Sequence, residues 1–219
     1  MIQENLQKIK ATLPENVTLV AVSKTKPIED LQVAYNAGQR IFGENKIQEM
    51  VDKYDALPKD IKWHMIGHLQ SNKVKYMAHF VDLIHGVDKF KTLNVINKEA
   101  KKNNRIINCL LQAKIAKEDT KFGLSFADIE AILSSKEIED LKNIKIVGLM
   151  GMATFTDDTD QLVAEFSSLK NFFNQLKTKY TDLKTLSMGM SGDYKIAIEN
   201  ESTMIRVGSS IFGHRNYIK

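Results

Sequence analysis

One lysine in this sequence has a setting that could carry chemistry. Lys24 follows the nearly continuous apolar run from Val17 to Ser23 and comes shortly before Pro27. Burial at the end of a strand lowers the pKa of an amine and makes its neutral, nucleophilic form more available. Lys24 is therefore a candidate to form a Schiff base with a carbonyl compound. Taken alone, the same pattern also fits an ordinary loop lysine that follows a strand.

Two glycine-rich segments near the other end of the chain could bind an anion. They are LSMGMSGD, Leu186 to Asp193, and MIRVGSSIFG, Met204 to Gly213, and each continues a short strand-like run. Glycines let a ligand approach the backbone closely, and hydroxyls, free amides and helix N-termini bind phosphate oxygens. Together they predict two halves of one phosphate site, Ser191–Gly192 and Gly208–Ser209. Each segment alone could be a turn, and Ser191 could instead cap the next helix.

Short strand-like runs alternate with helical patterns along the chain. Strands are expected near Thr18–Ser23, Arg40–Phe42, Ile61–Ile66, Val81–His85, Ile106–Ala113, Ile144–Leu149, Thr185–Met188 and Thr203–Val207. Helices are expected near Ile2–Thr12, Ile28–Ala37, Asn45–Leu57, Gln70–Ala78, Asp88–Lys102, Ala127–Ser135, Asp160–Lys177 and Gly192–Asn200. Eight β-α units predict an α/β fold, a single (β/α)8 TIM-type barrel with an extra N-terminal helix. A doubly wound open sheet is the alternative, because the shortest strands are easily miscounted.

A barrel would bring the lysine and the phosphate segments together. The working face of such barrels is the C-terminal end of the strands, and phosphate usually binds after the seventh and eighth strands. Strand one closes beside strand eight, so Lys24 would lie next to the predicted phosphate site. Lys26 has the same strand parity, but it lies about 6–7 Å further along and Pro27 restricts it to an extended conformation. Lys24 is therefore the better candidate.

The composition fits one folded domain, residues 1–219, with no linker. The 31 basic and 27 acidic residues give a formal net charge of +4 and are scattered along helix faces, so no nucleic-acid partner is expected. The single cysteine, Cys109, lies in an apolar run, which excludes an internal disulfide and predicts a buried, inert thiol. No apolar stretch approaches membrane-spanning length and the first residues lack a signal-peptide core. We expect a cytoplasmic protein without membrane association.

Eight short stretches occur together in one known family. They are VTLVAVSKTKP, IFGENKIQEMVDK, WHMIGHLQSNK, LIHGVDK, the KFG of Lys121 to Gly123, GLMGMATFTDD, LSMGMSGDY and IRVGSSIFG. They span nearly the whole chain in the expected order. A phosphorylated aldehyde captured by a lysine also describes pyridoxal 5'-phosphate. The chain resembles the pyridoxal phosphate homeostasis protein family, whose fold-type-III barrel is similar to the N-terminal barrel of alanine racemase.

The resemblance implies a cofactor-binding role for seven residues: Lys24, Asn45, Ser191, Gly192, Arg206, Gly208 and Ser209. Lys24 would be the Schiff-base lysine and Asn45 would contact the ring, although Asn45 could instead cap the next helix. The serines and glycines would bind the phosphate. Arg206 would face the pyridine nitrogen, where its permanent charge would weaken the ring as an electron sink. The alternative for Arg206 is an ion pair with a carboxylate inside the barrel.

Several histidines and methionines are expected to be structural. His64 and His68 are four residues apart but lack the helical HExxH pattern, so a zinc site is not expected. His85 ends an expected strand at the working rim, and a hydrogen-bonded scaffold role is favoured there over catalysis. The methionine-rich stretch from Gly148 to Met152 is expected to pack the top of the barrel.

The function predicted from the sequence is cofactor binding without established catalysis. Alanine racemase adds a second, β-rich domain and a tyrosine base from its partner subunit, whereas this sequence ends six residues after Gly213. We expect a monomer that holds pyridoxal 5'-phosphate on Lys24, buffers it and delivers it to apo-enzymes that depend on this cofactor. One alternative is a small amino-acid racemase that uses Lys24 as its base. A second is a Schiff-base aldolase acting on a phosphorylated sugar.

Overall fold

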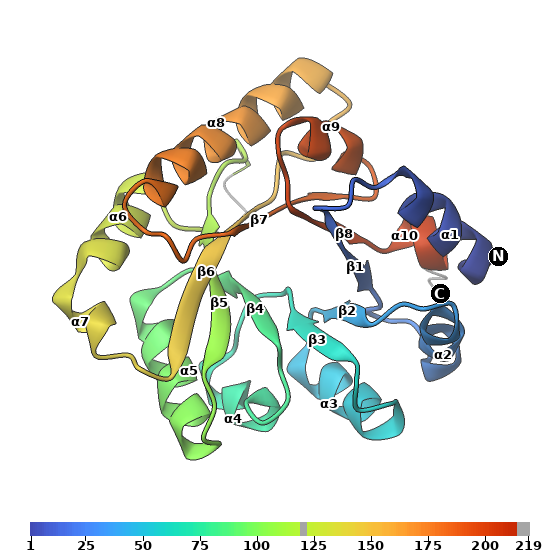
Figure 1. Ribbon diagram of the computed structural model, residues 1–219, viewed down its shortest axis with the longest axis horizontal. Coiled ribbons are helices and arrows are strands. Elements are labelled where there is room, and N and C mark those ends of the chain that lie inside the picture. The colour runs from blue at the N-terminus through green and yellow to red at the C-terminus, as the bar shows by residue number, and fades with distance from the viewer. Residues whose placement is uncertain (119–121, 214–219) are drawn as a thin grey trace.

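Eight parallel strands close into a barrel in the computed structural model, which describes residues 1–118 and 122–213. The strands follow chain order around the barrel, and β8 pairs with β1 (Figure 1). They are β1 Thr18–Val22, β2 Ile41–Glu44, β3 Lys62–Met65, β4 Leu83–Val87, β5 Ile107–Ala113, β6 Ile144–Gly151, β7 Thr185–Met190 and β8 Met204–Val207. The predicted barrel is confirmed and the open sheet is wrong. Lys121 of the KFG stretch lies outside the described residues.

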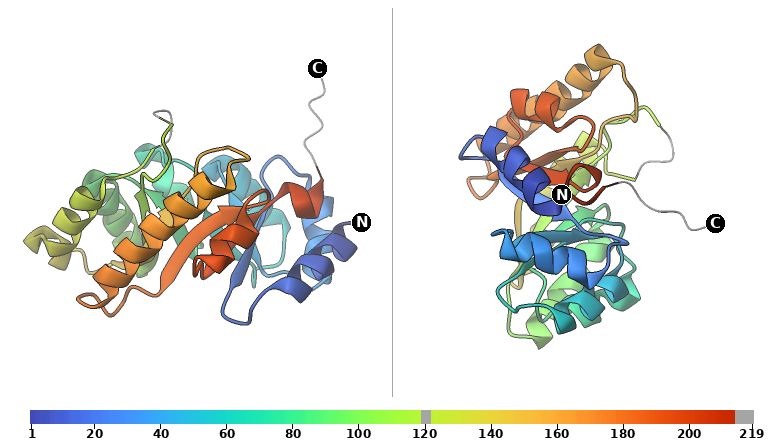
Figure 2. Two further views of the ribbon diagram at one scale, coloured as in Figure 1. Left: turned by 90° about the horizontal axis from the view of Figure 1, so that it is seen from above. Right: turned by 90° about the vertical axis from the view of Figure 1, so that its right-hand side faces the viewer.

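Helices surround the barrel on its outer side (Figures 1 and 2). They are α1 Ile2–Thr12, α2 Ile28–Asn36, α3 Ile47–Ala56, the 3-10 helix η1 Ser71–Lys73, α4 Val74–Met77, α5 Phe90–Lys102, α6 Phe126–Ser134, α7 Lys136–Glu139, α8 Thr159–Lys177, α9 Tyr194–Glu199 and α10 Ser209–Phe212. The expected N-terminal helix is α1, and it lies beside α10, where the Asn5 side-chain amide donates to the Ile211 carbonyl at 3.1 Å. The first helix therefore supports the segment that follows the last strand.

The largest differences from the expected elements occur where a side chain caps a helix or the backbone turns. Ser125 begins α6 in a capping box with Asp128. Ser135 ends this helix, and its hydroxyl accepts the N–H of Ile138 and begins the short α7, which the sequence did not indicate. The expected helix over Gln70–Ala78 divides into η1 and α4. Serine hydroxyls thus set boundaries that hydrophobic periodicity alone does not show.

The hydrophobic core has two parts. The larger part lies between the strands and the surrounding helices and includes Phe42 and Trp63, whose ring centroids are 6.0 Å apart. Each fully buried side chain of this size contributes about 1.5–3 kcal/mol. The smaller part lies inside the barrel and is formed by Val20, Leu83, Leu110, Met150 and Met204. Side chains alternate between the two faces of a strand, so residues two positions from this inner group also point into the barrel.

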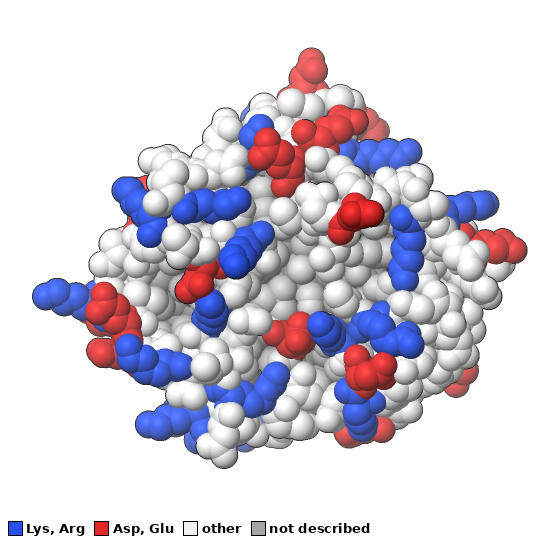
Figure 3. All heavy atoms as spheres, in the orientation of Figure 1, with Lys and Arg blue, Asp and Glu red and all other residues white. Residues whose placement is uncertain are grey.

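The surface and the single thiol agree with the composition. On the face shown in Figure 3, basic and acidic side chains are interspersed around a largely uncharged centre. Cys109 is fully buried, and burial raises the pKa of its thiol. This confirms the expected buried thiol, because a protonated thiol without solvent access is unreactive. Among the described residues, no helix has the length and apolar character needed to cross a membrane.

Candidate functional site

The carboxyl ends of the strands surround a cavity of about 1160 Å³. All seven residues predicted to bind a ligand line it: Lys24, Asn45, Ser191, Gly192, Arg206, Gly208 and Ser209. Other lining residues were not selected from the sequence as ligand contacts, among them Gln112, Phe122 and Phe155. Strand parity identifies Gln112, because it lies two positions after the inward-pointing Leu110 on β5. The two phenylalanines lie on loops, where no periodicity identifies them.

Lys24 lies in a tight turn directly after β1. The Ser23 N–H donates to the Gly43 carbonyl at 3.0 Å, and the Lys26 N–H donates to the Ser23 carbonyl at 3.0 Å. Within this turn Thr25 has a φ of 63°, a left-handed conformation that costs a β-branched residue about 1–3 kcal/mol. Lys24 is half-buried and reaches the cavity. The surrounding contacts must therefore hold a strained turn in place.

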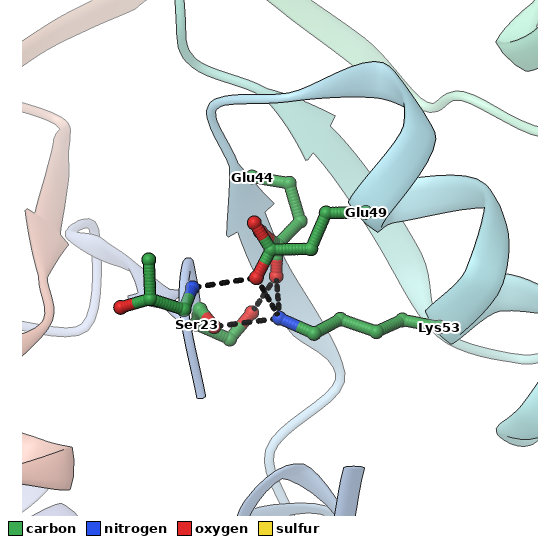
Figure 4. Close-up of polar contacts among 5 residues, drawn as sticks. Ser23, Glu44, Glu49 and Lys53 are labelled. Carbon is green, nitrogen blue, oxygen red and sulfur yellow. Dashed lines mark hydrogen bonds and ion pairs between the residues drawn. The ribbon is translucent and has the colours of Figure 1, made fainter. Parts of the chain in front are cut away.

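A buried group of charges, here called the Lys53 cluster, lies beside this turn (Figure 4). It consists of Ser23, Glu44 from β2, and Glu49 and Lys53 from α3. The Lys53 ammonium donates to Glu44 Oε1 and Glu49 Oε1, both at 2.8 Å, and to the Ser23 carbonyl at 2.7 Å. The Ser23 hydroxyl also donates to Glu44 Oε1, at 2.6 Å. The cluster thus ties β1, β2 and α3 together.

The Lys53 cluster holds the residues on both sides of Lys24. Ser23 is bound through its carbonyl and its hydroxyl, and the Thr25 N–H donates to Glu49 Oε1 at 2.5 Å. The backbone on each side of Lys24 is therefore attached to one rigid ion-pair network. Sequence reasoning missed this cluster, although Glu49 and Lys53 have the i, i+4 spacing of a helical ion pair. No short-range sequence pattern indicates that Glu44 also contacts Lys53.

Glu44 is a strongly perturbed carboxylate within the Lys53 cluster. Its side chain is fully buried, and its Oε2 has no hydrogen-bond partner among the described residues. Burial raises the pKa of Glu44 to about 7, while the charge and hydrogen bond of Lys53 and the hydrogen bond of Ser23 act in the opposite direction. The desolvation cost exceeds the gain from pairing, as is common for buried ion pairs.

Lys26, the competing lysine, lines the same cavity but has its own backbone partners. Its ammonium donates to the Phe212 carbonyl at 2.9 Å and to the Gly213 carbonyl at 3.0 Å. It therefore connects the turn after β1 with the end of α10.

The two predicted phosphate segments meet at a hydrogen bond. The backbone N–H of Gly208, after β8, donates to the Ser191 hydroxyl, after β7, at 3.1 Å. Ser191 does not cap α9, because that helix begins at Tyr194 with Asp193 at its N-cap position. The expected helix start at Gly192 is therefore wrong by two residues. Residues 190–193 instead form a turn in which the Met190 N–H donates to Asp193 Oδ1 at 2.5 Å.

The geometry of these segments leaves room for an anion. Ser209 and Ser210 are the first residues of α10, so their N–H groups have no acceptor one turn earlier in the helix. A Cβ atom added at Gly192 would meet no heavy atom within 4 Å. The packing of the protein itself therefore does not require glycine at position 192, and the missing side chain leaves open space beside these amides. A Cβ atom added at Gly208 would lie 3.1 Å from the Val22 carbonyl oxygen, so the end of β1 lies close to the Gly208 backbone.

Arg206 lies on β8 at the inner end of the cavity and is 4% exposed. Its guanidinium donates to the Ser187 hydroxyl at 2.6 Å and to the Gly151 carbonyl at 3.0 Å. Among residues 1–118 and 122–213 no carboxylate forms an ion pair with Arg206, which contradicts the ion-pair alternative within the described chain. Burial lowers the pKa of Arg206 to about 10, with Asp193 acting in the opposite direction. At neutral pH the side chain is therefore still charged.

Asn45 follows β2 and is positioned by a close backbone approach. The N-cap residue of α3 is Lys46, so the helix-capping role for Asn45 is wrong. A Cβ atom at Gly67 would lie 2.4 Å from the Asn45 carbonyl oxygen and 2.8 Å from its Cα. Glycine at position 67 therefore allows the loops after β2 and β3 to touch. This contact places Asn45 at the cavity wall.

The histidines occupy three different environments. His64 is buried, whereas His68 is partly exposed, lies 3.3 Å from Asp88 and stacks on Phe122 with ring centroids 4.6 Å apart. His85 lies in the middle of β4 and is fully buried, so its expected place at the rim is wrong. It is hydrogen-bonded, as expected for a scaffold residue. The described residues contain no group of three or more His, Cys, Asp or Glu able to hold a metal ion.

The raised pKa of Glu44 predicts how the substitution Glu44→Gln alters stability with pH. The unfolded chain loses this proton near pH 4.5, whereas the folded protein keeps it to about pH 7. The contribution of Glu44 to the free energy of unfolding is therefore largest below pH 4.5. It falls as the pH rises to 7, by at most about 3 kcal/mol. Urea unfolding should show that Glu44→Gln becomes more stable relative to the natural protein between pH 5 and pH 8.

Glu29→Gln provides the matched control, because Glu29 is an exposed glutamate on α2. Its stability difference from the natural protein should stay constant over the same pH range. A constant difference for Glu44→Gln as well would show that Glu44 is ionised throughout and that pairing with Lys53 outweighs burial.

The chain matches a protein-family model and several named relatives over nearly its whole length. The family model described as "Alanine racemase, N-terminal domain" matches residues 1–216. A pyridoxal phosphate homeostasis protein of Pasteurella multocida is 40% identical over 226 residues, covering 100% of this chain and 96% of its own length. The protein of the same name from Aquifex aeolicus is 36% identical and covers 99% and 96%. These relatives are named for homeostasis and not for a reaction.

Solved structures agree with the sequence relatives. PipY of Synechococcus elongatus, solved without PLP, matches with a TM-score of 0.91 and 35% identity, covering 97% of this chain and all of its own. PipY with PLP bound matches with a TM-score of 0.88. An alanine racemase of Clostridium difficile, at 14% identity, shares the fold with a TM-score of 0.81, and this chain covers 60% of it. The chain belongs to the pyridoxal phosphate homeostasis protein family, within the alanine racemase N-terminal domain family.

Proposed function

We propose that this protein binds pyridoxal 5'-phosphate in the cavity at the C-terminal end of its barrel, holds it through Lys24 and takes part in cofactor homeostasis. The observation that carries the proposal is that Lys24, the Ser191–Gly208 pair and Arg206 line one cavity. The name shared by the relatives, and the PLP bound in the PipY structure, support the same ligand. Cytoplasmic location, delivery to apo-enzymes and the monomeric state remain predictions from the sequence.

The residues present fit each part of this cofactor. When bound, pyridoxal 5'-phosphate supplies an aldehyde that condenses with an amine and a ring that withdraws electrons. Lys24 offers the amine on a turn that the Lys53 cluster fixes. Ser191 and the first amides of α10 offer donors for phosphate, and the open space at Gly192 admits it. Asn45 lies at the wall beside the proposed ring position.

The position and charge of Arg206 favour binding of pyridoxal 5'-phosphate without strong stabilisation of carbanions. A guanidinium donates hydrogen bonds and accepts none, so the ring nitrogen would have to accept from it. With a pKa of about 10, Arg206 stays charged at neutral pH and disfavours a proton on that nitrogen. An unprotonated ring withdraws electrons weakly. We therefore propose that the protein holds and releases the cofactor and does not use it to transform amino acids.

A racemase-like activity is the second candidate, because a further base lines the cavity. His68 lies 3.3 Å from Asp88 and belongs to the cavity wall, a pairing that the sequence did not indicate. A racemase needs a second acid or base opposite Lys24. The aldolase alternative has no comparable support, since none of the relatives described above is named an aldolase.

Borohydride reduction in the presence of pyridoxal 5'-phosphate should attach the ligand permanently to Lys24. Lys24 directly follows β1 and lines the cavity, whereas Lys26 lies two residues further along the chain. Peptide mass mapping should find the label on Lys24, and Lys24→Ala should lose it while Lys26→Ala keeps it. Circular dichroism should show both variants folded. A label found mainly on Lys26 in the natural protein would contradict the assignment.

Removing the phosphate from the ligand should weaken binding strongly. Charge-assisted hydrogen bonds contribute about 1.5–3 kcal/mol each, so pyridoxal should bind at least about tenfold more weakly than its phosphate. Ser191→Ala should lower the affinity for the phosphate ester and leave that for pyridoxal unchanged, as measured by absorbance titration. Equal affinities for the two aldehydes would show that phosphate binds elsewhere or not at all.

Amino acids added to the loaded protein should keep their α-protons. The charge of Arg206 weakens electron withdrawal, so proton exchange in heavy water should not exceed that caused by free cofactor. Nuclear magnetic resonance of alanine and glutamate would measure the exchange. Fast exchange that disappears in both Lys24→Ala and His68→Gln would instead establish the racemase-like candidate.

A further inference from the structure

A row of buried polar side chains crosses the barrel interior from Arg206 to Asp82. Arg206 Nη1 lies 2.6 Å from Ser187 Oγ, which lies 3.1 Å from His85 Nδ1. His85 Nε2 lies 3.1 Å from His64 Nδ1, and His64 Nε2 lies 3.4 Å from Asp82 Oδ2. The row begins at the cavity wall. It ends at the residue before β4, partly exposed at the opposite end of the barrel.

Chemistry allows one direction for these hydrogen bonds when both imidazoles are neutral. Arginine only donates, so Ser187 Oγ accepts from it, but a hydroxyl has two acceptor lone pairs and could also accept from His85. The Asp82 carboxylate at the other end only accepts, and it fixes the direction of the row. The neutral His85 then carries its hydrogen on Nε2 and donates to His64 Nδ1. His64 in turn carries its hydrogen on Nε2 and donates to the Asp82 carboxylate. The carboxylate thus selects the Nε2 tautomer in both histidines, and Ser187 donates to His85 Nδ1 while it accepts from Arg206.

The surroundings keep both imidazoles neutral. His85 is fully buried and His64 is 2% exposed. Burial is the largest cause that lowers the pKa of each, and Arg206 and the facing His64 lower that of His85 further. Lys62 also lowers the pKa of His64, and only Asp82 acts in the opposite direction. A proton on His85 Nδ1 would oppose the Ser187 hydroxyl and add a positive charge next to the guanidinium.

We propose that Ser187, His85 and His64 are positioning residues for Arg206, whose one-way hydrogen bonds hold the guanidinium toward the ring nitrogen of pyridoxal 5'-phosphate. This inference rests on the proposed function, because it explains how Arg206 is oriented to donate a hydrogen bond to that nitrogen. A guanidinium has five N–H donors, and the contacts with Ser187 and the Gly151 carbonyl use two of them. The other donors remain for the cavity. Without the row, a long side chain would be free to adopt other rotamers.

The tautomers of the natural protein give a test that needs no ligand and no variant. Long-range ¹⁵N–¹H correlation spectra of uniformly ¹⁵N-labelled protein at pH 7.5 distinguish a protonated from an unprotonated ring nitrogen. His64 and His85 should both carry their hydrogen on Nε2, and His68, which is partly exposed, serves as the internal reference. Hydrogen on Nδ1 of His85, or a charged ring at this pH, would overturn the inference.

Variants then connect the row to cofactor binding. Ser187→Ala should lower the affinity for pyridoxal 5'-phosphate on the order of tenfold, since a hydrogen bond to a charged group is lost. Ser202→Ala is the matched control, because Ser202 is a buried serine that bonds only backbone carbonyls of neighbouring strands. His85→Asn retains an acceptor near the position of Nδ1, whereas His85→Leu removes it. The asparagine variant should therefore bind nearly as well as the natural protein, and the leucine variant as poorly as Ser187→Ala.

The outcomes separate this inference from the proposed function. The positioning role is supported if both histidines carry their hydrogen on Nε2 and if Ser187→Ala and His85→Leu bind the cofactor more weakly while Ser202→Ala and His85→Asn do not. Unchanged affinity in Ser187→Ala, or equal losses in Ser202→Ala and Ser187→Ala, would overturn it. If the natural protein binds no pyridoxal 5'-phosphate, both the proposed function and the role of Arg206 toward its ring are wrong, although the tautomers would still show the direction of the hydrogen bonds in the row.

Discussion

The pairing of the first strand with the last determines where every candidate ligand contact lies. Ala21 on β1 pairs with Val207 on β8, which brings the turn after β1 beside the segment after β8. The Gly208 N–H then reaches the Ser191 hydroxyl, so the ends of β7 and β8 form one site next to Lys24. Without closure, the amine and the phosphate donors would lie at opposite edges of an open sheet. Lys26 strengthens the same junction by bonding the last carbonyls of the described chain.

Two buried charged groups support this junction from different sides, and both are costly to bury. The Lys53 cluster holds the strained turn that carries Lys24, even though Glu44 is desolvated enough to raise its pKa to about 7. Arg206 keeps its charge inside the barrel through hydrogen bonds to Ser187 and a backbone carbonyl. Partners that fix the geometry of a buried charge commonly indicate function, because apolar residues would be as stable there. The amine and the ring contact thus rest on preorganised supports.

The sequence allowed the fold and the clustering of Lys24 with the phosphate segments to be predicted, because β-α alternation and strand parity are local signals. It did not allow the supports to be predicted, because these depend on residues far apart in the chain. Glu44 meets Lys53 only when β2 lies beside α3. His85 was misplaced at the rim because β4 begins later than hydrophobicity indicated and its pairing with β5 is irregular between Ile84 and Val87. The capping role of Asn45 depends on where α3 begins, and its N-cap residue is Lys46; the close approach of Gly67 to the Asn45 backbone is likewise a contact between distant residues.

The structure of the protein crystallised with pyridoxal 5'-phosphate tests the central claim most directly. The account predicts continuous density from Lys24 Nζ to the ligand, with the phosphate between Ser191 and Gly208 and the ring nitrogen within hydrogen-bonding distance of Arg206. Ligand joined to Lys26, or phosphate bound away from the ends of β7 and β8, would contradict it.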